Sequence, residues 1–432
     1  MMYTPPVKAT TIEELDDLPE NSVEHVTLQC LLRELPKALL RHKKSIRFLD
    51  VSRNQLQDFP SWLPELEALT VLFASYNEFS TIPTSVRELS SLSMLGMRDN
   101  AISSLSEDAL PRSIRWLTLT NNLLTELPQS IGNLSLLKKL LLAGNKLSSL
   151  PDSICECSSL ELLRISSNLF TRFPPQLFRL NALAWIALGG NPFTTFPSSA
   201  LTFHHEDSSE KSSASLPIAW HRLTLQQELG RGASGITYRA LLDTNTTPQA
   251  VAVKIFTSEC SSDGSASDEM MYALAVGQHP NLLTPHTSFT EHDKGKMGLV
   301  YPLLGTDYIP LAAPPNFETV SRDDYSQSRS LSAEQCSQFC DDIEAAVKHL
   351  RLRKILHGDL YAHNTLINGR TALLSDFGAS FFYGHLPFEE QRRLEQIEEN
   401  AVHILYQELR ALTSSERDRH QRPPQTNSNA SK

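Results

Sequence analysis

The first half of the chain repeats one pattern of apolar and polar positions. Two leucine-like residues separated by one position precede an asparagine, and two apolar positions and a proline follow it. In one copy these positions are Leu140, Leu142, Asn145, Leu147, Leu150 and Pro151. The asparagines recur at intervals of about 23 residues, at Asn54, Asn77, Asn100, Asn122, Asn145, Asn168 and Asn191. The pattern predicts one short strand and one bend per unit, with the leucines pointing into a shared core.

A single unit of this kind cannot bury its own apolar face, so the units are expected to stack into a curved solenoid. The asparagine side chain is expected to satisfy backbone groups at each bend. A degenerate earlier copy has Cys30 at the asparagine position. The frame resembles the leucine-rich repeat family, with about eight repeats over residues 23–200 and an N-terminal segment over residues 1–22.

The residues between the buried leucines are expected to line the concave surface of the solenoid. Aromatic residues and arginine are favoured at interface hot spots, so we expect a protein-binding face here. Its partner is either another protein or the second half of this chain. The residues in these columns are Phe48, Phe73, Tyr76, Trp116, Leu141, Arg164 and Trp185, among which Phe48, Phe73, Trp116 and Trp185 are the expected contacts.

Two polar segments separate the expected domains from one another and from the C-terminus. Residues 201–216 are rich in serine and carry no apolar period, which predicts an interdomain linker. Residues 413–432 have no hydrophobic anchor, which predicts a disordered tail.

The second half contains a glycine-rich loop followed by a lysine in an apolar strand. Gly230, Gly232 and Gly235 lie between two strand-like runs, and Lys254 ends the run Ala250–Ile255. A lysine in a buried strand is costly unless it pairs with an anion. Glu269, at the start of an amphipathic segment, is the expected carboxylate partner. Asp268 and Glu259 are the alternatives, and a solvated carboxylate at a helix N-terminus is the other reading of Glu269.

Two further motifs follow in order. The run from His357 to Asn364 reads HGDLYAHN, and Asp376 begins DFG twelve residues after Asn364. Together with the glycine loop and the lysine strand, these motifs make residues 217–412 resemble a protein kinase domain. The implied fold is an α/β leucine-rich-repeat solenoid followed by an α+β bilobal kinase-like domain with a truncated C-lobe.

The resemblance implies a role for each motif residue, with ATP and Mg²⁺ as the cofactors. Asp359 would accept the proton of the attacking hydroxyl, and Asn364 and Asp376 would bind magnesium. Lys254 would hold the phosphates, and Glu269 would hold Lys254. The other residues implied at the nucleotide are Gly230, Arg231, Gly232, Ala233, Ser234, Gly235, Thr237, Ala252, Pro302, Leu304 and Leu366.

The chain departs from the kinase pattern in three places. Gly358 replaces the arginine that pairs with a phosphorylated activation loop, which predicts activity independent of that phosphorylation. Tyr361 and Ala362 match neither the serine/threonine nor the tyrosine signature. No A-P-E follows DFG, and Glu398 opens the next predicted helix, where it would steady the catalytic loop.

These features favour an ATP-dependent protein kinase, with serine or threonine preferred over tyrosine as the acceptor. Two alternatives remain open. The H-G-D spelling also resembles the aminoglycoside and choline phosphotransferases, and a pseudokinase scaffold would only hold the nucleotide. The intact DFG, the full glycine loop and the attached repeats favour the protein kinase.

Composition narrows the remaining classes. The 432 residues are 40% hydrophobic with a formal net charge of −10, which excludes a wholly disordered chain and argues against nucleic-acid binding. No apolar run is long enough for a membrane span, and the N-terminus lacks a signal-peptide core. With six sparse cysteines, we expect a cytoplasmic protein.

Overall fold

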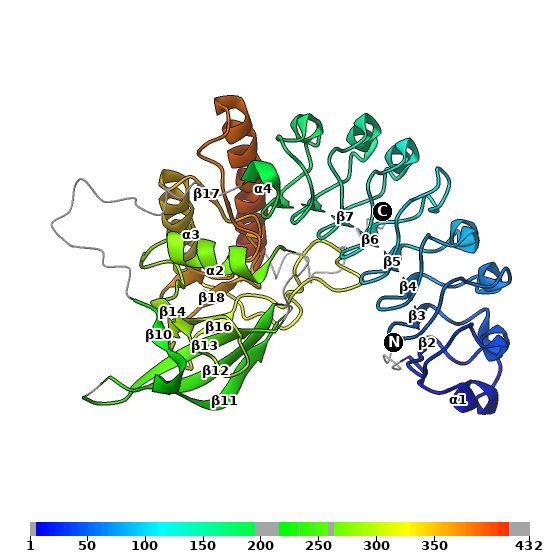
Figure 1. The fold of residues 1–432 in the computed structure, drawn as a ribbon, viewed down its shortest axis with the longest axis horizontal. Coiled ribbons are helices and arrows are strands. Elements are labelled where there is room, and N and C mark those ends of the chain that lie inside the picture. The colour runs from blue at the N-terminus through cyan, green and yellow to red at the C-terminus, as the bar shows by residue number, and fades with distance from the viewer. Residues whose placement is uncertain (1–5, 195–215, 233, 245, 258–262, 414–432) are drawn as a thin grey trace, which may run out of the picture.

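The computed structural model describes residues 6–194, 216–232, 234–244, 246–257 and 263–413. The chain forms an arc of repeats that is joined at its C-terminal end to a bilobal second half (Figure 1). Nearly all of the predicted linker and tail, and Ala233 of the glycine loop, lie outside the described residues.

The arc is built on one parallel sheet of nine strands in sequence order. Neighbouring strands pair in a constant register, so that Leu117, Leu140 and Leu163 lie side by side and are fully buried. The period-two alternation of each strand therefore places one leucine per repeat in the core. The strands are β1 Lys8–Ala9, β2 His25–Thr27, β3 Phe48–Asp50, β4 Val71–Phe73, β5 Met94–Gly96, β6 Trp116–Thr118, β7 Lys139–Leu141, β8 Leu162–Arg164 and β9 Trp185–Ala187.

Short 3₁₀ helices form the outer side of the arc. Several begin directly after a proline, whose fixed φ suits the residue that precedes a helix. The N-terminal end is covered by α1, Ile12–Asp17, which Thr11 and Glu14 close with a capping box. The 3₁₀ helices are η1 Lys37–His42, η2 Leu63–Glu65, η3 Thr84–Glu88, η4 Gln129–Asn133, η5 Asp152–Glu156, η6 Pro175–Phe178 and η7 Pro192–Thr194.

The repeated asparagines connect each repeat to the one before it. Asn145 donates from Nδ2 to the carbonyls of Leu119 and Leu142, at 2.9 Å each, and accepts from the Leu124 amide at 3.0 Å. A buried amide with all these partners satisfies the backbone at the bend. The predicted role of the asparagines is confirmed.

The second half begins with an N-lobe built on a six-stranded sheet in the order β10-β14-β15-β13-β12-β11. Helix α2, Ala266–Ala275, packs beside it and begins after Ser265, whose side chain accepts from the Asp268 amide. The strands are β10 Ile218–Ala219, β11 Leu223–Arg231, β12 Gly235–Leu242, β13 Gln249–Phe256, β14 Thr287–Thr290 and β15 Gly298–Pro302, and η9 spans Trp220–Arg222.

The C-lobe contains two long helices, α3 (Ala333–Leu352) and α4 (Phe388–Ala411), which pack together. The sequence predicts that a helix begins at Glu398. Helix α4 in fact begins ten residues earlier, because Pro387 already sets the helix entry. Residues 414–432, on which the predicted truncation of the C-lobe depends, lie outside the described residues. The strands of the C-lobe are β16 Ile309–Pro310, β17 Ile355–Leu356, β18 Thr365–Ile367, β19 Ala372–Leu374 and β20 Phe381–Phe382.

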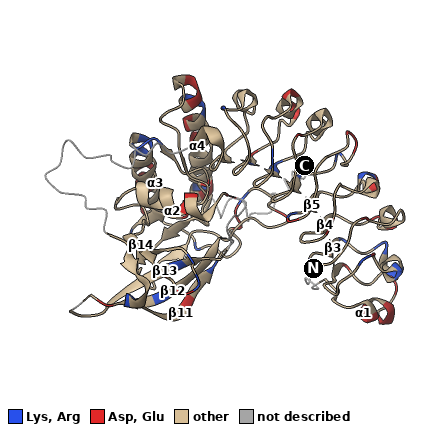
Figure 2. Cartoon of the chain, viewed as in Figure 1, with Lys and Arg blue, Asp and Glu red and all other residues tan. Residues whose placement is uncertain are grey.

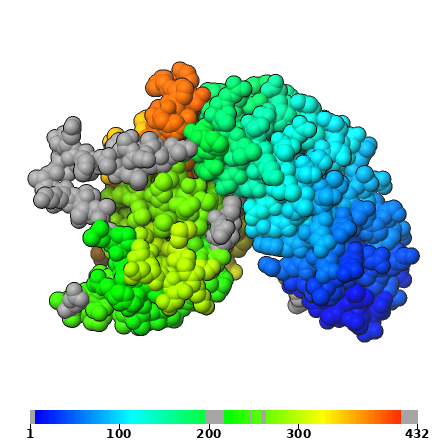
Figure 3. Space-filling view, in the orientation of Figure 1, coloured from blue at the N-terminus to red at the C-terminus, as the bar shows by residue number. Residues whose placement is uncertain are grey.

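The two halves share one continuous hydrophobic core, which runs from the repeats into α3 and α4. Figure 3 shows the second half against the C-terminal part of the arc. Lys, Arg, Asp and Glu occur in both halves (Figure 2). Among the described residues, no helix is long and apolar enough to cross a membrane.

A loop of the second half also reaches the concave face of the arc. The Phe317 ring lies 5.5 Å from that of Phe48 and 5.7 Å from that of Phe73, and Val320 is buried against β4 and β5. Trp116 packs at the edge of the same cluster. The sequence left open whether another protein or the second half of this chain contacts the concave face, and the structure places the second half there.

Candidate active site

The lysine of β13 is paired with the predicted carboxylate of α2. Lys254 Nζ bonds to Glu269 Oε1, and both side chains are largely buried. Asp268 lies on the same helix, where its backbone amide donates to the Ser265 side chain, and Glu259 lies outside the described residues. Of the three candidates, Glu269 is the partner of Lys254.

The catalytic-loop residues lie at the ends of the β18–β19 hairpin. Asn364 precedes β18 and Asp376 follows β19, and the Ser375 amide and hydroxyl both donate to the Asn364 carbonyl, at 2.9 and 2.8 Å. Asn364 Nδ2 donates to the Asp359 carboxylate at 2.8 Å and to its carbonyl at 3.0 Å. The hairpin thus brings Asp359, Asn364 and the DFG segment together.

The DFG segment is anchored by its phenylalanine while its aspartate remains exposed. Phe377 is buried against the His357 ring, with the ring centres 5.4 Å apart. Asp376 adopts a φ of +64° and accepts the Gly378 amide at 3.1 Å. A local hydrogen bond of this kind stabilises a left-handed aspartate and leaves its second oxygen for a ligand.

Glu398 steadies the catalytic loop from α4, as the kinase resemblance implies. Its Oε1 accepts the His357 amide at 2.7 Å, and the side chain is 2% exposed. Burial raises the pKa of Glu398 to about 7, although the hydrogen bond from His357 lowers it.

The glycine-rich loop lies between β11 and β12, which pair antiparallel as the kinase resemblance predicts. A Cβ at Gly230 or Gly232 would meet nothing within 4 Å, so the approach to this loop is open. Arg231 pairs with Glu228 of its own strand, 3.0 Å away.

The residues expected around adenine lie on neighbouring strands. Thr237 is opposite Lys254 in the β12–β13 pair, and Ala252 is opposite Tyr301 in the β13–β15 pair. Pro302 ends β15, and Leu366 lies on β18. The remaining predicted residues, Ser234, Gly235 and Leu304, adjoin the same strands.

Arg164, at the end of repeat strand β8, reaches the catalytic loop of the second half. Its guanidinium bonds to Asp359 Oδ1, and its Nε lies 3.3 Å from Asp263 Oδ1. Arg164 is 3% exposed. Arg164 is predicted from the sequence to lie on the concave face, whereas Asp263 is not among the predicted site residues. The one feature of the sequence that could have indicated this contact is the presence of an arginine among concave-face residues that are mostly uncharged.

The charges around the site oppose the effect of burial on the pKa values of Asp359 and Lys254. Burial alone would raise the pKa of Asp359, but Arg164, followed by His363 and His357, holds it below its usual value. Burial alone would lower the pKa of Lys254, but Asp376 and Glu269 raise it well above its usual value. Asp359 is therefore ionised and Lys254 protonated at neutral pH.

The side chains present suit a magnesium ion shared with phosphates. Asn364 uses its Nδ2 for Asp359, which leaves its amide oxygen for a cation, and Asp376 is exposed. Among the described residues, no group of three His, Cys, Asp or Glu side chains could hold a metal by itself. A magnesium ion held by one or two protein oxygens, with phosphates and waters as its other ligands, fits this donor set.

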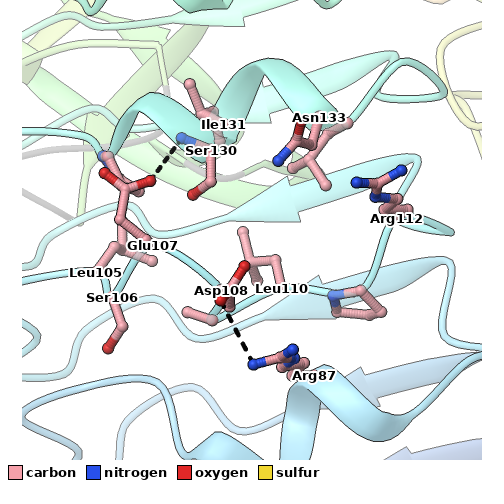
Figure 4. A pocket seen from close by; sticks show the side chains of 14 residues that line it. Arg87, Leu105, Ser106, Glu107, Asp108, Leu110, Arg112, Ser130, Ile131 and Asn133 are labelled. Carbon is pink, nitrogen blue, oxygen red and sulfur yellow. Dashed lines mark hydrogen bonds and ion pairs between the residues drawn. The ribbon is translucent and has the colours of Figure 1, made fainter.

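A separate cavity of about 250 Å³ lies on the repeats and takes no lining residue from the second half (Figure 4). It lies beside the irregular segment from Leu105 to Arg112. Three of its four charged side chains have partners, since Arg87 lies 3.5 Å from Asp108 and Glu107 accepts the Ser130 amide at 2.8 Å, and the fourth is Arg112. We assign the cavity no part in the site.

Comparisons with known proteins agree with this architecture. Residues 223–393 match the model of the protein tyrosine and serine/threonine kinase family, and residues 112–170 match the leucine rich repeat model. The chain therefore combines leucine-rich repeats with a protein kinase domain, as the motifs predict.

The tyrosine-protein kinase receptor TYRO3 of Danio rerio is 26% identical over 162 residues, which make up 37% of this chain and 18% of that receptor. The chain thus matches less than a fifth of the length of this relative. A leucine-rich repeat protein of Leptospira interrogans is 25% identical, covering 41% of this chain and 51% of its own, with a TM-score of 0.36. An internalin of Listeria monocytogenes is 21% identical, covering 42% and 52%, with a TM-score of 0.35.

Proposed function

We propose that this chain is an ATP-dependent, magnesium-requiring protein kinase that phosphorylates serine or threonine. The observation that carries the proposal is the buried Lys254–Glu269 pair, which lies near enough to Asp376 for that carboxylate to raise the pKa of the lysine. Phosphoryl transfer by protein kinases needs this pair and the DFG aspartate in place together.

Asp359 would receive the acceptor in an orientation fit for attack. Its carboxylate is ionised and held by Asn364, so it can accept a hydrogen bond from the acceptor hydroxyl. The hydroxyl oxygen bonds to the γ-phosphorus while the bond to the bridging oxygen of ADP breaks. The hydroxyl proton passes to Asp359.

Lys254 and the glycine-rich loop would hold the phosphates. The ammonium of Lys254, fixed by Glu269, offers charge-assisted hydrogen bonds to phosphate oxygens. Gly230 and Gly232 leave room for a phosphate to approach the backbone closely. Asn364 and Asp376 would hold magnesium, which, when bound, neutralises negative charge on the β- and γ-phosphates.

The acceptor class is the least constrained part of the proposal. The loop matches neither the tyrosine-kinase nor the serine/threonine spelling at Tyr361 and Ala362, and the repeats suit a protein partner. A second candidate, small-molecule transfer of the aminoglycoside or choline kinase type, is favoured by one observation. Only eleven residues separate Asp376 from Phe388 of α4, which leaves little chain for a peptide platform.

We extend the proposal to a protein partner on the repeats and to a cytoplasmic location. Because residues of the second half cover Phe48, Phe73 and Trp185, the partner would use the open remainder of the concave face, such as Tyr76, which Arg53 and Arg98 flank. The location follows from the five described cysteines, which are free thiols. Crosslinking through a photoreactive residue at position 76 and cell fractionation test these two points.

Transfer from labelled ATP tests the activity. The full chain is incubated with Mg²⁺ and γ-labelled ATP, alone and with casein, a Glu-Tyr copolymer, an aminoglycoside or choline. We expect labelled casein or self-labelled chain, and loss of label in Asp359→Asn and Asp376→Asn. Asp341→Asn, on the exposed side of α3, is the matched control and should keep full activity.

The other outcomes each point to a different function. Equal labelling in Asp359→Asn would mean that the transfer comes from a contaminant or another site. Label on the copolymer, or on the small molecules alone, would replace the serine/threonine assignment. ATP binding without any transfer would identify a pseudokinase.

A further inference from the structure

Repeat strands β8 and β9 end directly against the catalytic loop. Strand β8 supplies Arg164, whose guanidinium bonds to Asp359, and β9 supplies Trp185, whose Nε1 donates to the Leu360 carbonyl at 3.0 Å. The backbones also meet, since the Ile186 amide donates to the Gly358 carbonyl at 3.0 Å. The repeats and the kinase half thus build this loop together.

The Asp359 carboxylate is held from both halves of the chain. Arg164 bonds to Oδ1 from the repeats, and Asn364 Nδ2 bonds to Oδ2 from the kinase half. Two donors on different oxygens fix the plane of the carboxylate while each oxygen keeps capacity to accept another hydrogen bond.

Gly358 leaves no room for the arginine that protein kinases carry at this position. It has a φ of +76°, and a Cβ there would lie 2.4 Å from the Ile186 carbonyl oxygen and 2.8 Å from that of Ala379. Only glycine tolerates both the backbone conformation and the close approach of β9. The close approach of the repeat strands to the catalytic loop therefore excludes an arginine at position 358. The same approach brings Arg164 of β8 to Asp359.

The contact is a permanent part of the fold. Trp185 is 1% exposed and stacks on Tyr361, and Arg393 donates to the carbonyls of Leu177 and Leu180, each at 2.7 Å. Asn400 adds a hydrogen bond to the Leu183 carbonyl at 2.8 Å. Separating the halves would expose this shared core, so the Arg164–Asp359 pair does not resemble a detachable inhibitory clamp.

From these contacts we infer that Arg164 is a positioning residue for phosphoryl transfer. Its guanidinium, supplied by the repeats, keeps the Asp359 carboxylate aimed at the acceptor hydroxyl. The repeats therefore complete the kinase site of their own chain in addition to any role in binding a partner. The inference rests on the proposed kinase function.

The surrounding charges agree with this role. Asp359 is faced by Arg164 from β8, Lys139 from β7 and Asp263 from the segment before α2, and by His357, Tyr361 and His363 of its own loop. Arg164 is the largest of the influences that lower the pKa of Asp359 against the effect of burial.

Steady-state kinetics test the role in catalysis. Arg164→Met is expected to lower kcat roughly tenfold to a hundredfold, the cost of a small misplacement, with KM for ATP within about twofold. Arg164→Lys should restore part of kcat. Arg179→Met, an exposed repeat arginine 3.7 Å from Glu156, is the matched control and should behave as wild type.

A rise of kcat in Arg164→Met would overturn the inference and identify an inhibitory contact. An unchanged kcat would also overturn it.

A double-mutant cycle tests whether Arg164 and Asp359 interact, independently of any activity. Urea unfolding is measured for wild type, Arg164→Met, Asp359→Asn and the double variant. Because the pair is buried, the second substitution should cost much less than the first. If the losses of unfolding free energy in the two single variants simply add in the double variant, the inference is overturned, even if no phosphoryl transfer is ever detected. If the two substitutions are coupled but wild type shows no transfer, only the proposed function is contradicted.

Discussion

Trp185 of the last repeat strand lies flat on Tyr361 of the catalytic loop, with ring centres 4.2 Å apart and planes 6° from parallel. The indole is buried, and its Nε1 is bonded to the Leu360 carbonyl. Each half of the chain thus contributes one ring to the junction. The stability of the repeats is therefore coupled to that of the kinase half.

Trp185→Ala should destabilise the whole chain and uncouple its halves. Removing a buried tryptophan costs about 3–5 kcal/mol, and here it also removes the hydrogen bond to Leu360. We expect wild type to unfold in one calorimetric transition and the variant in two. Trp62→Ala is the control, because Trp62 is partly buried, lies at the start of η2 and packs on the hydrophobic core. An equal loss in both variants would contradict the special role of Trp185.

Gly358→Ala should also be costly, because the position combines a positive φ with close contacts to two carbonyl oxygens. We expect a loss of about 2–4 kcal/mol in urea unfolding, from the left-handed conformation and the displacement of β9. Gly358→Arg should not improve activity. Gly369→Ala, where a Cβ meets nothing within 4 Å, is the matched control. Similar stability of the two alanine variants would show that β9 does not restrict position 358.

Sequence predicts the elements of this molecule better than it predicts their junction. The asparagine period predicts the solenoid because every repeat must solve the same hydrogen-bonding problem at its bend. The ordered motifs predict the Lys254–Glu269 pair because kinase chemistry requires both residues. In each case the structural requirement is local, so it leaves either a repeated pattern or a short motif in the sequence.

The Arg164–Asp359 contact follows no such rule. Its residues are 195 positions apart, and the linker between them carries no pattern that would orient the two halves. Asp263 belongs to a serine-rich segment that is typical of exposed loops, yet it reaches Arg164. Tertiary packing decides these contacts, and a single sequence does not show which surface of the arc meets the kinase half.

Lys254→Met should weaken nucleotide binding while leaving the fold intact enough to measure. Losing a charge-assisted contact to phosphate corresponds to about 1.5–3 kcal/mol, so the Kd for Mg·ATP should rise roughly tenfold to a hundredfold by titration calorimetry. Lys348→Met, exposed on α3, is the control. Unchanged affinity in Lys254→Met would mean that the nucleotide does not use the β13 lysine.

The stability of the chain should depend on pH through Glu398, whose pKa burial raises to about 7 against the hydrogen bond from the His357 amide. An unfolded glutamate titrates near 4.5, so between about pH 4.5 and 7 the folded chain holds a proton that the unfolded chain releases. The stabilising effect of the protonated carboxyl is therefore fully present below pH 4.5 and is lost as pH rises to 7. At about 1.4 kcal/mol per pKa unit, the loss is about 3 kcal/mol.

Comparison with Glu398→Gln isolates this carboxyl from the other groups that titrate nearby. Arg351 and Glu395 also face Glu398, and they remain in both chains. We expect the free energy of unfolding of wild type to fall by about 3 kcal/mol relative to Glu398→Gln between pH 4.5 and 8, measured by urea unfolding. Glu389→Gln, exposed in the first turn of α4, should follow the wild-type curve. A constant difference between wild type and Glu398→Gln across this range would show that folding does not raise the pKa of Glu398, because only a group that binds a proton differently in the two states can bend the curve.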